Sequence, residues 1–227
     1  MAELIIVFRE VLEASLIVGI LYTYLNKTGQ SASIIKLWQG VLSALAMSIL
    51  GSLLFQKLAG GFHGKAEKLF EGIVMIIAAI VLGTMIVWMA KNRNIADDIK
   101  EKAEDALENE KLGYGIFALA FISVFREGIE TILFLYGVMM KQGGLNTTLS
   151  LVGAGLGVGL GYMIFVQGKN VPLKTFFNVS SVLLIFVAAG MMAYGIHELE
   201  SAGIIPDYGR LWNINPPQLP DGTYPLM

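Results

Sequence analysis

Long apolar runs recur along most of the chain and are separated by short polar stretches. Each run approaches the roughly 20 residues that a helix needs to cross the hydrocarbon core of a bilayer. Six such runs occupy residues 4–25, 37–58, 71–90, 114–139, 147–167 and 176–197. The pattern therefore predicts an all-α integral membrane protein with six transmembrane helices.

Residues 91–113 interrupt this pattern because charged side chains of both signs dominate them. Ile95, Ile99, Ala103 and Leu107 recur there at helical spacing, which predicts an amphipathic cytoplasmic linker helix. An acidic surface that collects metal is the alternative interpretation. The predicted organisation is a three-helix unit at 1–90, this linker at 91–113, a second three-helix unit at 114–197 and an extracytoplasmic tail at 198–227.

The two units share sequence. VFREVLE at residues 7–13 recurs as VFREGIE at residues 124–130, with five of seven positions identical. FEGIVMIIAAIVLGTM at 70–85 likewise parallels FNVSSVLLIFVAAGMM at 177–192. A duplicated unit with an odd number of spans is inverted relative to its copy, so we expect an inverted repeat with its binding site between the halves near the bilayer midplane.

Composition supports the membrane assignment and narrows the chemistry. The chain is 55% hydrophobic and 15% charged, with a net charge of −2 and no cysteine. The absence of a basic stripe argues against nucleic-acid binding, and the absence of cysteine leaves only oxygen or imidazole ligands for a metal. Loops after the first, third and fifth runs hold nine Lys and Arg residues against five on the other side, which predicts an outside N-terminus.

Both copies of the repeated motif place charges deep within a predicted span. An ionisable side chain there costs about 2.5–3.5 kcal/mol on insertion scales and usually marks a functional site. Helical spacing lets each arginine reach the glutamate four residues on, so we expect Glu10 and Glu127 to lack a cationic partner. The charged residues are Arg9, Glu10, Glu13, Arg126, Glu127 and Glu130.

Four carboxylates against two guanidinium groups leave two negative charges, and Glu71 at the start of the third run adds a third. A bound cation would balance this excess. Carboxylate oxygens favour hard or borderline metals, so iron(III), calcium, magnesium and manganese all fit. The alternative is a pair of closed salt bridges that only holds the bundle together. Met85 and the other methionines of the spans are interpreted as apolar filler.

The R-E-x-x-E motifs resemble the signature of the oxidase-dependent iron permeases of fungi and bacteria. The segments EGIVMIIAAIVLGTMIVWM at 71–89 and GIHELESAGIIP at 195–206 resemble the same family. The resemblance implies high-affinity iron uptake through the cell membrane (inner or plasma), with iron as the transported substrate and no permanently bound cofactor. It also implies that Glu10, Glu13, Glu127 and Glu130 carry iron, with Arg9 and Arg126 as motif arginines.

The resemblance further implies an extracytoplasmic partner, either a ferroxidase or another iron-delivery protein. Glu71 is then a candidate gateway ligand, and His197, Glu198 and Glu200 are candidates for recruiting iron at the outer end of the sixth run. Ordinary helix-terminal roles are the alternative for all four. Members of this family usually have seven spans, so six spans indicate a short or truncated member. The sequence predicts no oligomeric state.

Three other functions remain open at the level of sequence. An intramembrane metal-dependent hydrolase could use glutamate beside a metal-activated water, although both histidines fall at or outside span ends. A transporter of another divalent metal fits the same ligands. A structural or sensing protein would use its charged helices only for assembly with a partner.

Overall fold

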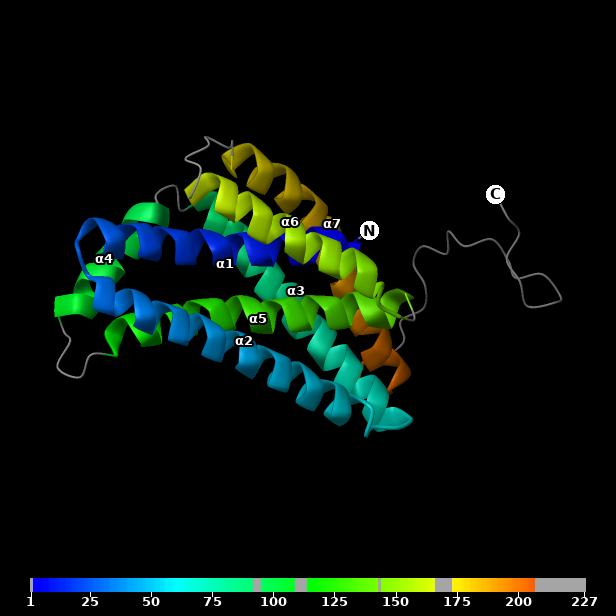
Figure 1. Cartoon of the computed structure of the whole chain (residues 1–227). Helices are drawn as coiled ribbons and strands as arrows, with labels where there is room; N and C mark the ends of the chain where they lie inside the picture. Colours follow the sequence, from blue (N-terminus) through cyan, green and yellow to red (C-terminus); the bar gives the residue numbers. More distant parts are fainter. Residues whose placement is uncertain (1, 92–94, 109–113, 143, 166–172, 207–227) are drawn as a thin grey trace.

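The computed structural model of the chain describes residues 2–91, 95–108, 114–142, 144–165 and 173–206 (Figure 1). Within these ranges every regular element is a helix, and there are seven of them. They are α1 (Ala2–Lys27), α2 (Ser31–Ala59), α3 (Lys65–Lys91), α4 (Ile95–Glu108), α5 (Gly115–Gln142), α6 (Thr147–Phe165) and α7 (Leu173–Ser201).

The six apolar runs correspond to α1, α2, α3, α5, α6 and α7, and the predicted amphipathic helix is α4. Helix α5 begins at Gly115, so the apolar run 114–139 was predicted one residue too long at its start. Residues 166–167 of the fifth run, both ends of the predicted linker and most of the predicted tail lie outside the described residues. The prediction of an all-helical protein is therefore confirmed.

Four helical segments are long and apolar enough to cross a membrane: Ser31–Ala59, Lys65–Val87, Thr147–Phe165 and Val179–Ser201. Helices α1 and α5 are equally long, but every 18-residue stretch of either contains at least three charged residues. The charges responsible are mainly those of the repeated motif. The two helices that are least typical of a span are thus the two that carry the candidate site.

Helix α1 lies at the centre of the bundle and packs against α2, α5 and α6, while α2 packs along α5 and α3 along α7 (Figure 1). Helices α1 and α6 begin at the same end, where the backbone N–H of Asn146 donates to the carboxylate of Glu3. Helices α2 and α5 end there, with Phe55 and Tyr136 in ring contact. We call this the N-terminal end of the bundle.

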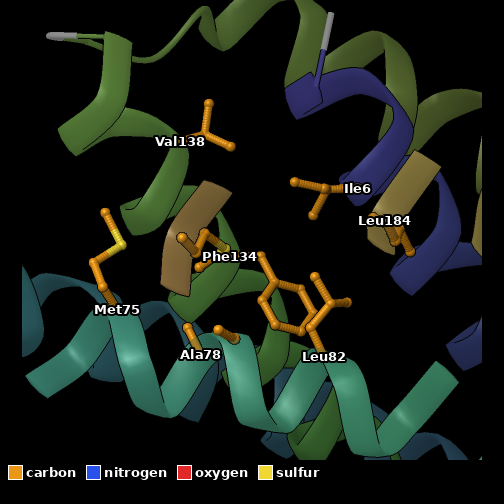
Figure 2. Close-up of a cluster of buried hydrophobic side chains, with 9 residues drawn as sticks. Ile6, Met75, Ala78, Leu82, Phe134, Val138 and Leu184 are labelled. Atoms are coloured by element: carbon orange, nitrogen blue, oxygen red, sulfur yellow. The ribbon is translucent and has the colours of Figure 1, made fainter. Parts of the chain in front are cut away.

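Two apolar clusters hold α1 and α5 together, one on each side of the repeated motif. Toward the N-terminal end, Phe134 of α5 packs with Ile6 of α1 and with Leu82 of α3 (Figure 2). Toward the opposite end, Leu21 of α1 packs with Val124 of α5 and with neighbours from α2 and α4. The motif charges therefore lie in a layer with apolar packing above and below.

The outer surface of the helices is strongly apolar. Leu53 of α2, Leu151 of α6 and Phe186 of α7 are 60%, 68% and 72% exposed, and many other large apolar side chains are similarly exposed. So large an apolar surface is unfavourable in water and favourable against lipid chains. Together with the apolar helices it indicates a multi-pass membrane protein.

Helix α6 approaches α1 closely through a face of glycines. A Cβ atom at Gly153 would lie 2.6 Å from the carbonyl oxygen of Leu4, and one at Gly157 would lie 3.0 Å from that of Phe8. Neither backbone atom can move without shifting α1. By contrast, a Cβ at Gly155, on the other face of α6, meets nothing within 4 Å. Small residues on one face thus permit the close packing of these two helices.

This asymmetry predicts that Gly153→Leu destabilises the protein and Gly155→Leu does not. Overpacking against the α1 backbone should lower the free energy of unfolding by about 1–3 kcal/mol or more. Thermal unfolding of both purified variants in the same detergent measures the difference. Equal melting temperatures for the two variants would contradict the packing described here.

Candidate functional site

The repeated motif brings six charged side chains into the middle of the bundle. On both α1 and α5 the two glutamates are three residues apart, so they lie on the same helix face. Because α1 packs against α5, the two faces meet. All four carboxylates are buried: Glu10 is 1% exposed, Glu13 9%, Glu127 2% and Glu130 8%.

Each arginine contacts both glutamates of its own motif. Arg9 Nη1 lies 3.2 Å from Glu10 Oε1, and Arg9 Nε lies 3.1 Å from Glu13 Oε1. In α5, Arg126 Nη2 lies 2.8 Å from Glu127 Oε1, and Arg126 Nε lies 3.3 Å from Glu130 Oε1. The expectation that Glu10 and Glu127 lack a cationic partner was therefore wrong. A guanidinium group has several N–H groups, so it contacts the next residue and the residue four positions on at the same time.

Three of the carboxylates converge across the interface of α1 and α5. One oxygen from each of Glu10, Glu127 and Glu130 lies within 4.8 Å of the others. The Oε2 atoms of these three residues are buried and make no hydrogen bond to the described part of the chain. Glu13 lies beside the three, bound to Arg9, and is not a member of this group.

A group of this kind needs positive charge or protons. Like charges held this close repel one another, and burial in a low dielectric raises the cost of each. The two arginines occupy one oxygen of each carboxylate, which leaves the Oε2 atoms as free acceptors. Buried carboxylate oxygens without donors are suitable ligands for a hard or borderline cation. We call Glu10, Glu127 and Glu130 the central carboxylates.

The two motif arginines differ in their surroundings. Arg9 is fully buried, and its Nη1 also lies 3.2 Å from Met85 Sδ of α3. The side chain of Arg126 is 52% exposed. Interpreting Met85 only as filler was thus incomplete, since it contacts a charged residue of the site. No pattern in the sequence signals this contact, which joins residues 76 positions apart.

A cavity of about 320 Å³ adjoins the central carboxylates. Glu10 and Glu127 line it, and the remaining wall comes from α1, α2, α5 and Leu145 beyond α5. Most of this wall is apolar. It extends along α2 and α5 to Phe55 and Tyr136, near the N-terminal end of the bundle. Sequence reasoning missed the contribution of α2, which carries no charge in this stretch.

The other candidate residues lie apart from the central carboxylates, at the N-terminal end. Glu71 of α3 is close enough to Glu67 and Glu198 for their charges to interact. Tyr194 hydrogen-bonds the carboxylate of Glu198. The first turns of α3 lie against the last turns of α7 at this end, where Gly72 packs against Leu199. Glu71, the candidate gateway ligand, is not a member of the central group, and its role as a gateway ligand stays a prediction.

His197 and Glu200 also lie at this end, on the last turns of α7. His197 Nδ1 is 3.9 Å from Glu200 Oε2, and the histidine side chain is 60% exposed. These two residues and Glu198 are therefore placed together at one end of the bundle, as the sequence suggested, but at the surface. Their role in recruiting iron stays a prediction.

Comparison with known proteins identifies a family. The sequence matches the Iron permease FTR1 family over residues 1–214. A protein named "Ferrous iron permease EfeU" from Escherichia coli O6:H1 is 34% identical over 212 residues, covering 92% of this chain and 74% of the relative. A protein of the same name from Yersinia pestis is 31% identical over 215 residues, covering 92% and 73% respectively.

An uncharacterized protein from Archaeoglobus fulgidus is 33% identical over 198 residues, covering 87% of this chain and 69% of the relative. No solved structure matches the chain.

The contrast between the arginines predicts that Arg9→Gln destabilises the protein more than Arg126→Gln. Removing Arg9 leaves two buried carboxylates uncompensated and a gap beside Met85, at a cost of about 3–5 kcal/mol. Removing Arg126 also leaves Glu127 and Glu130 without their cation, but its position is half-exposed, so water can enter there and reduce the cost. Thermal unfolding in one detergent compares the two, and a larger loss in Arg126→Gln would contradict the description.

The central carboxylates also predict direct cation binding. Glu10→Gln should weaken binding of iron(II) under anaerobic conditions by roughly tenfold or more, because a charged ligand contact contributes about 1.5–3 kcal/mol. Isothermal titration of the purified protein measures the dissociation constant. Glu101→Gln, which changes an exposed carboxylate of α4, is the matched control. Equal affinities in the two variants would show that the cation binds elsewhere.

Proposed function

The chain belongs to the iron permease FTR1 family, and on that basis we propose that it moves iron across a membrane on the glutamates of α1 and α5. It is a transporter and not an enzyme, which sets aside the intramembrane hydrolase. The observation that carries the residue assignment is the convergence of Glu10, Glu127 and Glu130 within 4.8 Å, each with a buried, unbonded oxygen.

Iron suits this group by charge and by ligand type. Carboxylate oxygens bind iron in either oxidation state without sulfur or imidazole, and the described centre offers neither a thiolate nor a histidine. The named relatives from Escherichia coli and Yersinia pestis are ferrous iron permeases. Iron(II) is therefore the ion we propose for the first test, with high-affinity uptake as the physiological activity.

We propose that six helices cross the membrane as an inverted repeat, α1 to α3 and α5 to α7, with α4 as the linker between them. The packing supports this. In such a repeat α1 corresponds to α5, α2 to α6 and α3 to α7. The contact between α1 and α6 then corresponds to the contact between α5 and α2, and both contacts are extensive. The same correspondence maps the α1 and α5 pair and the α3 and α7 pair onto themselves, and both of these occur as well.

Transport then follows from a difference between the two related pairs. Helix α6 stays close to α1 up to Phe165. A Cβ atom at Gly19 of α1 would overlap the ring of that phenylalanine. Helix α2 starts close to α5, where a Cβ at Gly40 would lie 2.6 Å from the carbonyl oxygen of Phe117. Toward its end, however, α2 borders the cavity. We infer an alternating-access cycle in which the halves exchange these arrangements around the central carboxylates.

The cavity extends toward the N-terminal end, which the distribution of basic residues assigns to the outside. We propose that iron arrives there from an extracytoplasmic ferroxidase or iron-delivery protein, across the inner or plasma membrane. Glu71, Glu198, Glu200 and His197 all lie at this end, where they would meet the ion first.

Uptake of radioactive iron(II) into proteoliposomes tests this function. Glu127→Gln and Glu130→Gln should each reduce the initial rate at least about tenfold, because each removes a charged ligand worth about 1.5–3 kcal/mol. Glu101→Gln on the exposed face of α4 controls for the loss of one negative charge. Uptake that is unchanged in the central variants, at equal reconstitution, would reject their assigned role.

A further inference from the structure

The second half of α2 has polar residues along one face. Ser48, Ser52 and Gln56 are spaced four residues apart, so they form a stripe along that face. All three line the cavity that holds Glu10 and Glu127. On the facing helix α5, Thr131 lines the same cavity. From Ser48 to Gln56 the stripe covers nine residues, and the eight helical rises between them correspond to about 12 Å.

The hydroxyl groups of this stripe present acceptors to the cavity. Ser48 donates its proton to the carbonyl oxygen of Ala44 at 2.9 Å, and Thr131 donates to the carbonyl oxygen of Glu127 at 2.8 Å. A hydroxyl whose proton is committed to the backbone retains oxygen lone pairs. Such oxygens stabilise a cation or its hydration water and offer no donor to an anion.

The next residues along the stripe continue this arrangement. Gln56 Nε2 donates to Ser52 Oγ at 3.4 Å, which leaves the amide oxygen of Gln56 as an acceptor. Beyond Gln56 the cavity reaches the N-terminal end beside Phe55 and Tyr136, whose ring centroids are 4.9 Å apart. Acceptors therefore follow one another from the end of α2 to the level of the motif.

At the inner end of the stripe are two carboxylates, each paired to an arginine through one oxygen and left without a donor at the other. Glu10 and Glu127 are 1% and 2% exposed, both line the cavity, and the Oε2 atom of each lacks a hydrogen-bond partner there. A purely apolar wall would oppose the approach of a cation to this point. The stripe is the polar part of the wall that leads to it.

We propose that Ser48, Ser52 and Gln56 of α2, with Thr131 of α5, form the water-accessible passage by which the cation travels from the N-terminal end to the central carboxylates. The inference rests on the proposed transport function and assigns it a route. The competing occupant of the cavity is a lipid chain, which would keep water and ions out.

The chain contains no cysteine, so single cysteines can be introduced without a background thiol. Ser52→Cys and Gln56→Cys each place a thiol on the stripe, and position 56 is nearer the N-terminal end of the bundle. Leu50→Cys and Leu54→Cys place one on the opposite face of α2, where the side chains are 58% and 60% exposed. The probe is a membrane-impermeant, positively charged methanethiosulfonate reagent, and intact mass measures its reaction in proteoliposomes.

We expect the thiols of the stripe to react at least tenfold faster than those of the lipid-facing pair. Millimolar iron(II) should slow the reaction of Ser52→Cys and leave that of Leu54→Cys unchanged. Labelling should also reduce iron uptake by Ser52→Cys at least tenfold relative to the same variant before labelling. Similar rates on both faces of α2, or labelled stripe variants that transport at their unlabelled rate, would overturn the proposal.

The same measurements separate this inference from the transport function. If the unmodified protein takes up iron but the stripe is unreactive, the function stands and the passage lies elsewhere. If the unmodified protein takes up no iron, the proposed function fails. The labelling rates of the stripe cysteines, with and without iron(II), then still show whether a cation enters this cavity. Retained reactivity without slowing by iron(II) counts against the passage.

Discussion

The structure depends on one arrangement of charge: two guanidinium groups and four carboxylates held between α1 and α5 in an otherwise apolar bundle. Each arginine binds both glutamates of its own helix, so neither motif is a single closed salt bridge. This leaves the Oε2 atoms of Glu10, Glu127 and Glu130 without donors where the helices meet. Buried ions are unfavourable unless their charge is balanced, and here the balance requires a cation or protons.

The remaining helices keep this layer in place. Apolar clusters above and below it pack α1 against α5 on both sides of the charged faces. The glycines of α6 permit a close approach to α1, while α2 and α5 together border a cavity. In the inverted repeat that we propose, these two pairs correspond to each other, and only the pair α2 and α5 borders the cavity. This difference is what an inverted repeat requires if it is to expose a central site to each side in turn.

Sequence reasoning found the helices and the charged motifs because both follow from local periodicity. Long apolar runs predicted the six long helices, and spacing on a single helix predicted that Arg9 would reach Glu13 and that Arg126 would reach Glu130. The contact of Arg9 with Met85 joins helices distant in sequence and has no local signature. The polar stripe of α2 was equally hidden, since isolated serines are common in apolar helices, where their hydroxyls bond the preceding turn.

The most direct test of the central claim is anomalous diffraction at the iron edge from crystals soaked with iron(II). We expect a peak between the carboxylates of Glu10, Glu127 and Glu130, within ligand distance of their unbonded oxygens. The peak should vanish when Glu10 and Glu127 are both replaced by glutamine. A peak found only at the surface beside Glu71 and Glu198, with nothing between α1 and α5, would contradict the assignment of the buried glutamates as the site that carries the ion.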